Sequence, residues 1–114
     1  MTIEQVAQIL NAEYICCEEN KHKEVLSACG SDMMSDVLAY AKDQSVLITG
    51  LCNPQVVRTA EMMDMVCVVF VRGKYPSEDT IALAKQKGLV MMTTKRRMFS
   101  ACGKLYSAGL VSGN

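Results

Sequence analysis

The chain has 114 residues, half of them apolar, and its twelve Lys and Arg residues balance its twelve Asp and Glu residues. That length suits one domain with its own core, so we expect a single domain over residues 1–114. The zero net charge argues against a general nucleic-acid binder, which carries a basic excess. No run approaches the roughly 20 apolar residues that span a bilayer, and no basic region followed by an apolar run opens the chain. We therefore expect a cytoplasmic protein that binds neither nucleic acid nor membrane.

Six cysteines are spread along the chain, at positions 16, 17, 29, 52, 67 and 102. They include no CxxC pair, and His22 is the only histidine. The closely spaced ligand pairs of a zinc site are therefore missing. We interpret the thiols as small buried hydrophobes in a reducing compartment, and we expect no metal and no cofactor. The alternative, a redox or metal sensor, requires thiols that converge in space.

The first third of the chain predicts one helix and two strands. Thr2 and Gln5 form a capping-box pattern at the start of a short amphipathic helix that runs to Leu10. Residues 14–17 and 24–29 are strand candidates on either side of the polar turn EENKHK, and the second ends at Gly30.

The remainder repeats strand and helix. Residues 45–49, 66–71 and 90–93 are predicted strands, and the run VCVVFV at 66–71 is typical of a strand covered on both faces. Helices are predicted after the cap Asn53, after the cap Ser77, and over residues 97–108. This alternation predicts right-handed parallel crossovers. The expected fold is a compact three-layer α/β/α domain with a small, mostly parallel sheet.

The stretch SDMMSD at residues 31–36 separates two of these elements. Ser35 is a suitable helix cap and Asp36 suits a first helical turn, so Val37, Leu38 and Ala41 are expected to face inward. Ser31 and Asp32 follow a strand end, where α/β folds collect functional groups. Two interpretations stay open: a turn that ties the loop to itself, or the rim of a binding site.

Residues 25–50 and 53–110 resemble the DRTGG domain family. The matching features, in order, are the S-D-x-M-S-D junction, Thr49-Gly50, Asn53 with Gln55, Arg72-Gly73 with Pro76, and Thr93-Thr94-Lys95. The chain departs from the string that names the family, because it carries Ala28-Cys29-Gly30 there. DRTGG domains resemble the N-terminal domain of HPr kinase/phosphorylase and, more distantly, that of Mur ligases. The resemblance implies a compact α/β unit that is not itself catalytic.

A kinase activity is not supported by the residues. Phosphoryl transfer of the HPr kinase type needs a G-x-x-x-x-G-K-[ST] loop to hold phosphates, and the sequence contains none. Gly103-Lys104 lies inside the last predicted helix and precedes Leu105 where Ser or Thr is needed. His22 could pair with a thiol only if folding brought the two together. We therefore predict that the protein is not an enzyme.

The resemblance implies a regulatory or ligand-binding module that associates as a homodimer. Its pocket is expected at the carboxyl ends of the parallel strands. The candidate ligand-binding residues are Asp32, Ser35, Asp36, Thr49, Gly50, Asn53, Arg72, Gly73, Thr93, Thr94 and Lys95. Arg72 and Lys95 would offer positive charge to a small anionic or nucleotide-like ligand.

Two alternatives accompany this prediction. Thr93 and Thr94 could merely cap the last helix, and the run from Lys95 to Arg97 could be a solvated charged segment. Stand-alone relatives occur beside hydrogenase and electron-transfer genes, so the alternative function is docking on such a partner protein. That function predicts an exposed apolar patch in place of a pocket.

Overall fold

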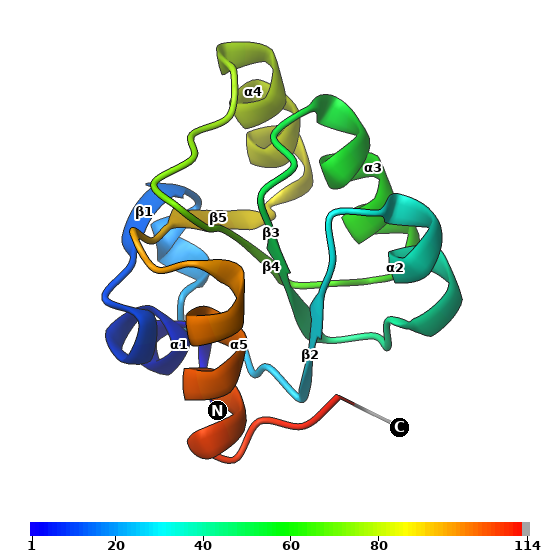
Figure 1. Ribbon diagram of the computed structural model, residues 1–114. Coiled ribbons are helices and arrows are strands. Elements are labelled where there is room, and N and C mark those ends of the chain that lie inside the picture. Colours follow the sequence, from blue (N-terminus) through cyan, green and yellow to red (C-terminus); the bar gives the residue numbers. More distant parts are fainter. Residues whose placement is uncertain (113–114) are drawn as a thin grey trace.

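A five-stranded sheet forms the middle layer of the structure (Figure 1), a computed structural model that describes residues 1–112. The helices are α1 (Ile3–Leu10), α2 (Met34–Tyr40), α3 (Pro54–Met62), α4 (Glu78–Lys87) and α5 (Met98–Ser107), with a short 3-10 turn at Glu18–Asn20. The strands are β1 (Glu13–Cys16), β2 (Ser27–Gly30), β3 (Ser45–Thr49), β4 (Cys67–Phe70) and β5 (Val90–Thr93). Their order is β1-β5-β4-β3-β2, and β1 alone runs antiparallel to its neighbour. The predicted three-layer fold is confirmed.

The helices divide between the two faces of the sheet according to strand order (Figure 1). Strands β2 to β5 are neighbours in chain order, so each crossover steps in the same direction. Right-handed steps then leave α2, α3 and α4 together on one face, while α1 and α5 pack together on the other. The loop after β4 therefore leads to one face and the loop after β5 to the opposite face. Such a divergence between neighbouring strands opens a crevice at their carboxyl ends.

The two central strands form the middle of the core. Every residue of β3 and β4 is buried, and Phe70 is the largest side chain without solvent contact. Both faces of these strands are covered by helices, which explains the uninterrupted apolar run that the sequence shows. Polar residues inside this core, such as Ser45 and Thr49, donate hydrogen bonds to Lys42 O and to Asp32.

Several predicted boundaries are wrong for tertiary reasons. β2 begins at Ser27 and not at Glu24, because Glu24 and Val25 pair with the first residues of the chain. Helix α2 begins at Met34 with Met33 in the cap position, so Ser35 lies inside the first turn and is not the cap. Leu38 was expected to face inward and is exposed.

The cysteines behave mainly as small apolar residues. Cys16, Cys17 and Cys67 are buried, the other three are half-buried, and all six are free thiols. Burial raises the pKa of Cys16 to about 12 and that of Cys67 further still. Residues 1–112 hold no cluster of three or more His, Cys, Asp or Glu side chains suited to a metal ion. Over the same residues, none of the helices has the length and apolarity to cross a bilayer.

The buried thiols predict a stability that falls at alkaline pH. A thiol that stays neutral when folded but ionises when unfolded favours unfolding above its ordinary pKa of 9.0. Below that pH, the Cys67 thiol has no pH-dependent effect on the free energy of unfolding. Above it, the free energy of unfolding falls by about 1.4 kcal/mol per pH unit, until the folded thiol ionises as well. Urea unfolding of the wild type and of Cys67→Ala between pH 8 and 10.5 measures the difference. Parallel pH profiles for the two proteins would contradict the prediction.

Candidate functional site

Two loops meet at the carboxyl ends of β4 and β5. The backbone N–H groups of Arg72 and Gly73 donate to Arg96 O and Thr94 O, each over 2.8 Å. Arg72 and Gly73 both have left-handed backbone conformations, with φ of 60° and 67°. Two such residues in succession turn the chain sharply after β4. The turn brings residues 73–75 against the end of β5.

Thr93 and Thr94 hold this arrangement from opposite sides of the sheet. Successive strand residues point to opposite faces, so the two hydroxyls reach different segments. Thr93 Oγ1 donates to Lys74 O over 2.7 Å, and Thr94 Oγ1 donates to Leu10 O over 2.7 Å. Neither caps α5, whose cap position is Arg97, so the capping alternative is wrong. The Thr94 hydroxyl is fully used within the fold, which leaves it no role as a ligand donor.

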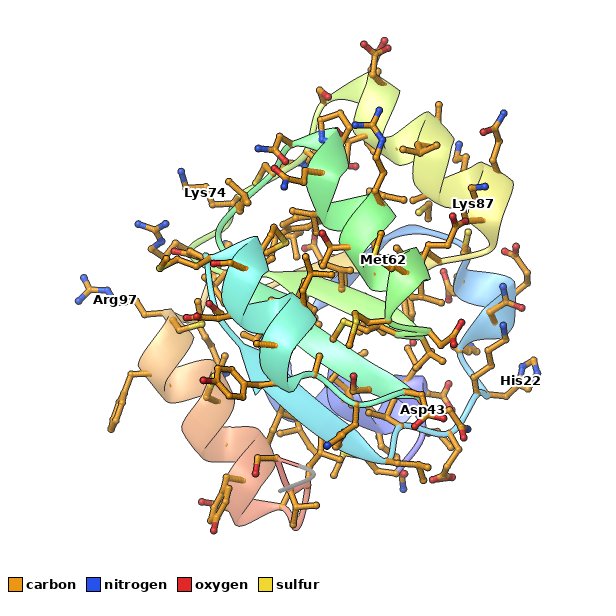
Figure 2. The ribbon with its side chains drawn as sticks, turned by 90° about the vertical axis from the view of Figure 1, so that its right-hand side faces the viewer. His22, Asp43, Met62, Lys74, Lys87 and Arg97 are labelled. Carbon is orange, nitrogen blue, oxygen red and sulfur yellow. The ribbon has the colours of Figure 1, made fainter. Side chains whose placement is uncertain are left out.

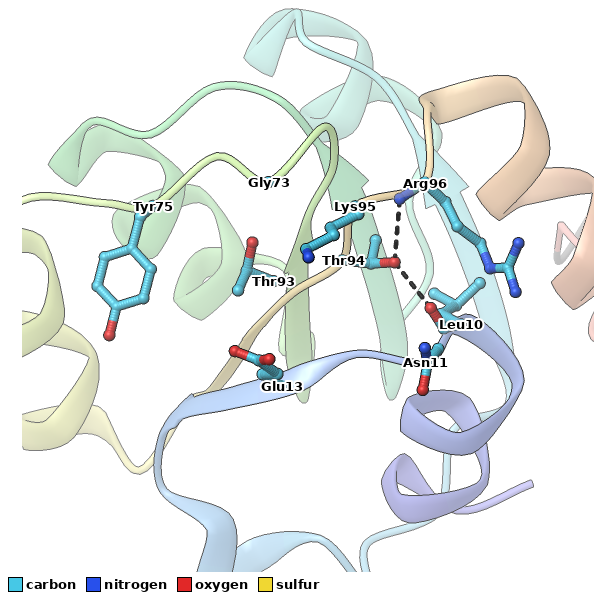
Figure 3. Close-up of a pocket in the computed structure, with 9 residues that line it drawn as sticks. All are labelled: Leu10, Asn11, Glu13, Gly73, Tyr75, Thr93, Thr94, Lys95 and Arg96. Carbon is cyan, nitrogen blue, oxygen red and sulfur yellow. Dashed lines mark hydrogen bonds between the residues drawn. The ribbon is translucent and has the colours of Figure 1, made fainter.

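A pocket with a volume of about 660 Å³ opens between these segments (Figure 3). Its lining comes from the end of α1 and the start of β1, from the β4–α4 loop, and from the β5–α5 loop: Leu10, Asn11, Glu13, Gly73, Tyr75, Thr93, Thr94, Lys95 and Arg96. Tyr75 stands at one side of Thr93, and the Arg96 guanidinium lies at the other end of the pocket, beyond Leu10. The Tyr75 side chain is 61% exposed. The site thus combines an apolar ring with charged groups.

Positive charge gathers at this end of the molecule. Five of the twelve Lys and Arg residues lie in the two loops: Arg72, Lys74, Lys95, Arg96 and Arg97. None of them takes part in an ion pair with another residue of the described range 1–112. Arg96 Nε is buried and has no hydrogen-bond partner among the same residues. Figure 2 shows Lys74 and Arg97 at one edge of the molecule, and His22 and Lys87 at the opposite edge.

Asp32 joins the neighbouring loops on the β3 side of the same sheet edge. Its Oδ1 accepts hydrogen bonds from Gly50 N over 2.6 Å and from Thr49 Oγ1 over 3.1 Å. Ser31 instead closes a local turn, because its hydroxyl accepts from Met33 N over 3.0 Å. The two halves of the Ser31-Asp32 pair therefore differ. Ser31 ties the loop to itself, and Asp32 ties it to the end of β3.

The Arg72 side chain lies over Gly50, between the two parts of the sheet edge. A Cβ atom at Gly50 would stand 2.7 Å from Arg72 Nη2 and 3.5 Å from Asp32 Oδ1. The absence of a side chain at Gly50 therefore allows the guanidinium to approach the backbone. Asn53 caps α3 by accepting from Gln55 N over 3.0 Å. Arg72, Gly50 and Asp32 form a polar rim next to the pocket.

The predicted site residues fall into three groups. Gly73, Thr93, Thr94 and Lys95 line the pocket; Asp32, Thr49, Gly50, Asn53 and Arg72 form the neighbouring loops; Ser35 and Asp36 lie on α2. Asp36 faces a different, smaller cavity of about 260 Å³ beside β2, together with Cys29 and Tyr40. The structure therefore does not bring Ser35 and Asp36 to the pocket.

The sequence alone missed five lining residues: Leu10, Asn11, Glu13, Tyr75 and Arg96. Three belong to the segment around the antiparallel edge strand β1, to which the rule for parallel strand ends does not apply. An aromatic residue directly after Gly73-Lys74, in a polar loop, was the one available signal for Tyr75.

Replacing Asp32 by Ala should lower stability by about 1 kcal/mol, because it removes two hydrogen bonds between loops. Asp43→Ala is the matched control, since Asp43 is an exposed loop carboxylate at the far edge of the molecule (Figure 2). Urea denaturation of both variants measures the difference. Equal stability of Asp32→Ala and the wild type would show that the Asp32 bonds contribute nothing.

Comparisons with known proteins found one family that matches the sequence and a solved structure with a similar fold. No protein with a curated description matches it significantly. The model of the DRTGG domain matches residues 5–108. A similar solved structure is that of the CBS and DRTGG domains of the regulatory region of Clostridium perfringens pyrophosphatase, determined with its activator, diadenosine tetraphosphate. The two structures superimpose with a TM-score of 0.75, and their sequences are 18% identical. The match covers 98% of this chain and 48% of the pyrophosphatase regulatory chain.

This chain therefore spans about half of the regulatory structure that it matches. The fold agreement and the family match support the resemblance read from the S-D-x-M-S-D junction and the loops that follow it. The similarity to HPr kinase stays a prediction. Since the family model covers nearly the entire chain, this protein belongs to the DRTGG domain family.

Proposed function

We propose that this DRTGG domain is a regulatory module that binds a small anionic, nucleotide-like ligand in the pocket at the ends of β4 and β5. The observation that carries the proposal is that Lys95 and Arg96 line a pocket of about 660 Å³ without an ion-pair partner in the described range 1–112. Arg72, Lys74 and Arg97 lie in the same two loops and add to the positive field at this end of the molecule, which favours an anion beside Lys95 and Arg96. The buried Arg96 Nε–H, which has no partner within residues 1–112, gains a charge-assisted hydrogen bond from the same anion.

The similar structure supports the class of ligand. Diadenosine tetraphosphate, with which the pyrophosphatase regulatory region was determined, is a nucleotide with several negative charges. A pocket of about 660 Å³ lies within the range of roughly 300–1,000 Å³ typical of small-molecule sites. The residues that line it include no histidine and one carboxylate, Glu13, so we propose binding without catalysis.

We propose in addition that the domain associates as a homodimer through α5. Phe99 is 90% exposed on the outer surface of this helix, and Tyr106, seven residues later, is exposed on the same side. Gly103, one turn after Phe99, lies in a shallow groove beside α1 and leaves open space where a side chain would stand. A protruding ring and a hollow on one surface meet the self-complementarity that a two-fold interface requires. Docking on an electron-transfer partner, the alternative function, would use the same surface.

Replacing Lys95 by Met should weaken binding of ATP and of inorganic tripolyphosphate at least fivefold, because one charge-assisted hydrogen bond is lost. Stability without ligand should not change, since the exposed Lys95 has no ion pair within residues 1–112. Isothermal titration calorimetry measures the affinities, and Lys23→Met, in the polar turn at the opposite edge, is the matched control. Absence of binding by both compounds at millimolar concentration would refute the proposed function.

The wild type should sediment as a dimer at a protein concentration of roughly tens of micromolar, at which even a modest interface is occupied. Phe99→Ser should shift it to monomer because the change removes the protruding ring. Met62→Ser removes an exposed apolar side chain from α3, in the other helix layer, and should leave the mass unchanged. A monomeric wild type would count against association through α5.

A further inference from the structure

One acidic residue stands among the cations of the pocket. Glu13 lies on β1 directly opposite Thr93, so both side chains point to the same side of the sheet. Figure 3 shows its carboxylate directed towards Thr93, in the space that Lys95 also faces. The two charges nevertheless do not form an ion pair within the described residues. A carboxylate repels phosphate, so a purely anionic ligand gives it no partner.

The backbone of Tyr75 is held in a defined position although the ring is exposed. Pro76 follows it and is buried, and a residue before proline is restricted to extended conformations. Lys74, which precedes it, is tied to the end of β5 by the bond from the Thr93 hydroxyl. The backbone that carries the Tyr75 ring is therefore positioned before a ligand arrives, which lowers the ordering cost of binding.

Resting on the proposed function, we infer that the ligand is a ribonucleotide whose base stacks on Tyr75 and whose ribose hydroxyls donate to Glu13. A carboxylate has two acceptor oxygens and suits the two donors of a ribose diol. Aromatic rings bind any base through its π-face. The phosphates then lie among Lys95 and Arg96.

The order of groups in the pocket agrees with the order of groups in a nucleotide. Tyr75 lies at one end, Glu13 and Lys95 face the middle, and the Arg96 guanidinium lies at the other end (Figure 3). A free amino acid is the rival, with its carboxylate on Lys95 and its ammonium on Glu13. It would leave the Arg96 end of a 660 Å³ pocket unused.

The test compares ligands that differ in the base, in the ribose hydroxyls or in the presence of the nucleoside. Binding of ATP, GTP, CTP, UTP, 2′,3′-dideoxy-ATP, inorganic tripolyphosphate and, for the rival, the free amino acids glycine and glutamate to the wild type is measured by calorimetry. At least one ribonucleotide should bind roughly tenfold or more tightly than tripolyphosphate, owing to stacking. Dideoxy-ATP should bind about tenfold more weakly than ATP, because the bonds to the carboxylate are lost.

Two variants assign these differences to residues. Glu13→Ala should abolish the preference for ATP over dideoxy-ATP and should strengthen tripolyphosphate binding, because a repulsive charge is removed. Tyr75→Ala should reduce ATP affinity about tenfold through lost stacking and keep the preference for ATP over dideoxy-ATP, whereas Tyr75→Phe should change neither. Tyr40→Ala, an exposed tyrosine on α2, is the control.

The outcomes separate this inference from the proposed function. Equal affinity for tripolyphosphate and all four ribonucleotides would overturn the ribonucleotide inference and leave an anion site standing. Unchanged discrimination in Glu13→Ala would overturn the role of the carboxylate. Tight binding of a free amino acid with no nucleotide binding would overturn both, as would the absence of any binding.

Discussion

The hydroxyl groups of Thr93 and Thr94 are the contacts on which the candidate site depends. They leave the end of β5 in opposite directions and bind the carbonyls of Lys74 and Leu10. One bond sets the loop that carries Tyr75, and the other sets the end of α1, next to Asn11. Because all three walls meet at these two residues, the shape of the pocket follows from the alternation of side chains along one strand. These two adjacent residues thus determine where the charged and aromatic groups of the pocket lie.

The position of the pocket follows from the order of the strands. The crossovers from β2 to β5 all step in one direction and place their helices on one face, so the loops after β2, β3 and β4 lead the same way. Only the loop after β5 crosses to the other face. A crevice therefore opens at β4 and β5, whereas Asp32 and Gly50, at the other end of the sheet edge, hydrogen-bond one another. Polar residues at strand ends line a pocket where the neighbouring loops diverge, and they hydrogen-bond to one another where the loops run together.

Charge is distributed unevenly although the net charge is zero. The cations of two loops share one edge of the molecule, and the ion pairs within residues 1–112 lie elsewhere. A local field of one sign attracts counter-ions even in a neutral protein. Composition alone excludes a general polyanion binder, and it does not exclude a small anion site. The distinction depends on which residues the fold brings together, and here the two loops lie about twenty residues apart in the sequence.

The sequence by itself determined the α/β class, the three strand–helix repeats and the family, because apolar periodicity and cap residues are local signals. It also marked Gly73, Thr93 and Lys95, which lie at or just after strand ends. It did not determine the start of β2, which depends on pairing with Thr2, or the cap of α2, where Met33 occupies the position expected for Ser35. Glu13, Asn11 and Tyr75 come to the pocket only because an antiparallel edge strand and a left-handed turn approach β5. Such long-range contacts leave no periodic trace in the sequence, and only the tertiary structure decides them.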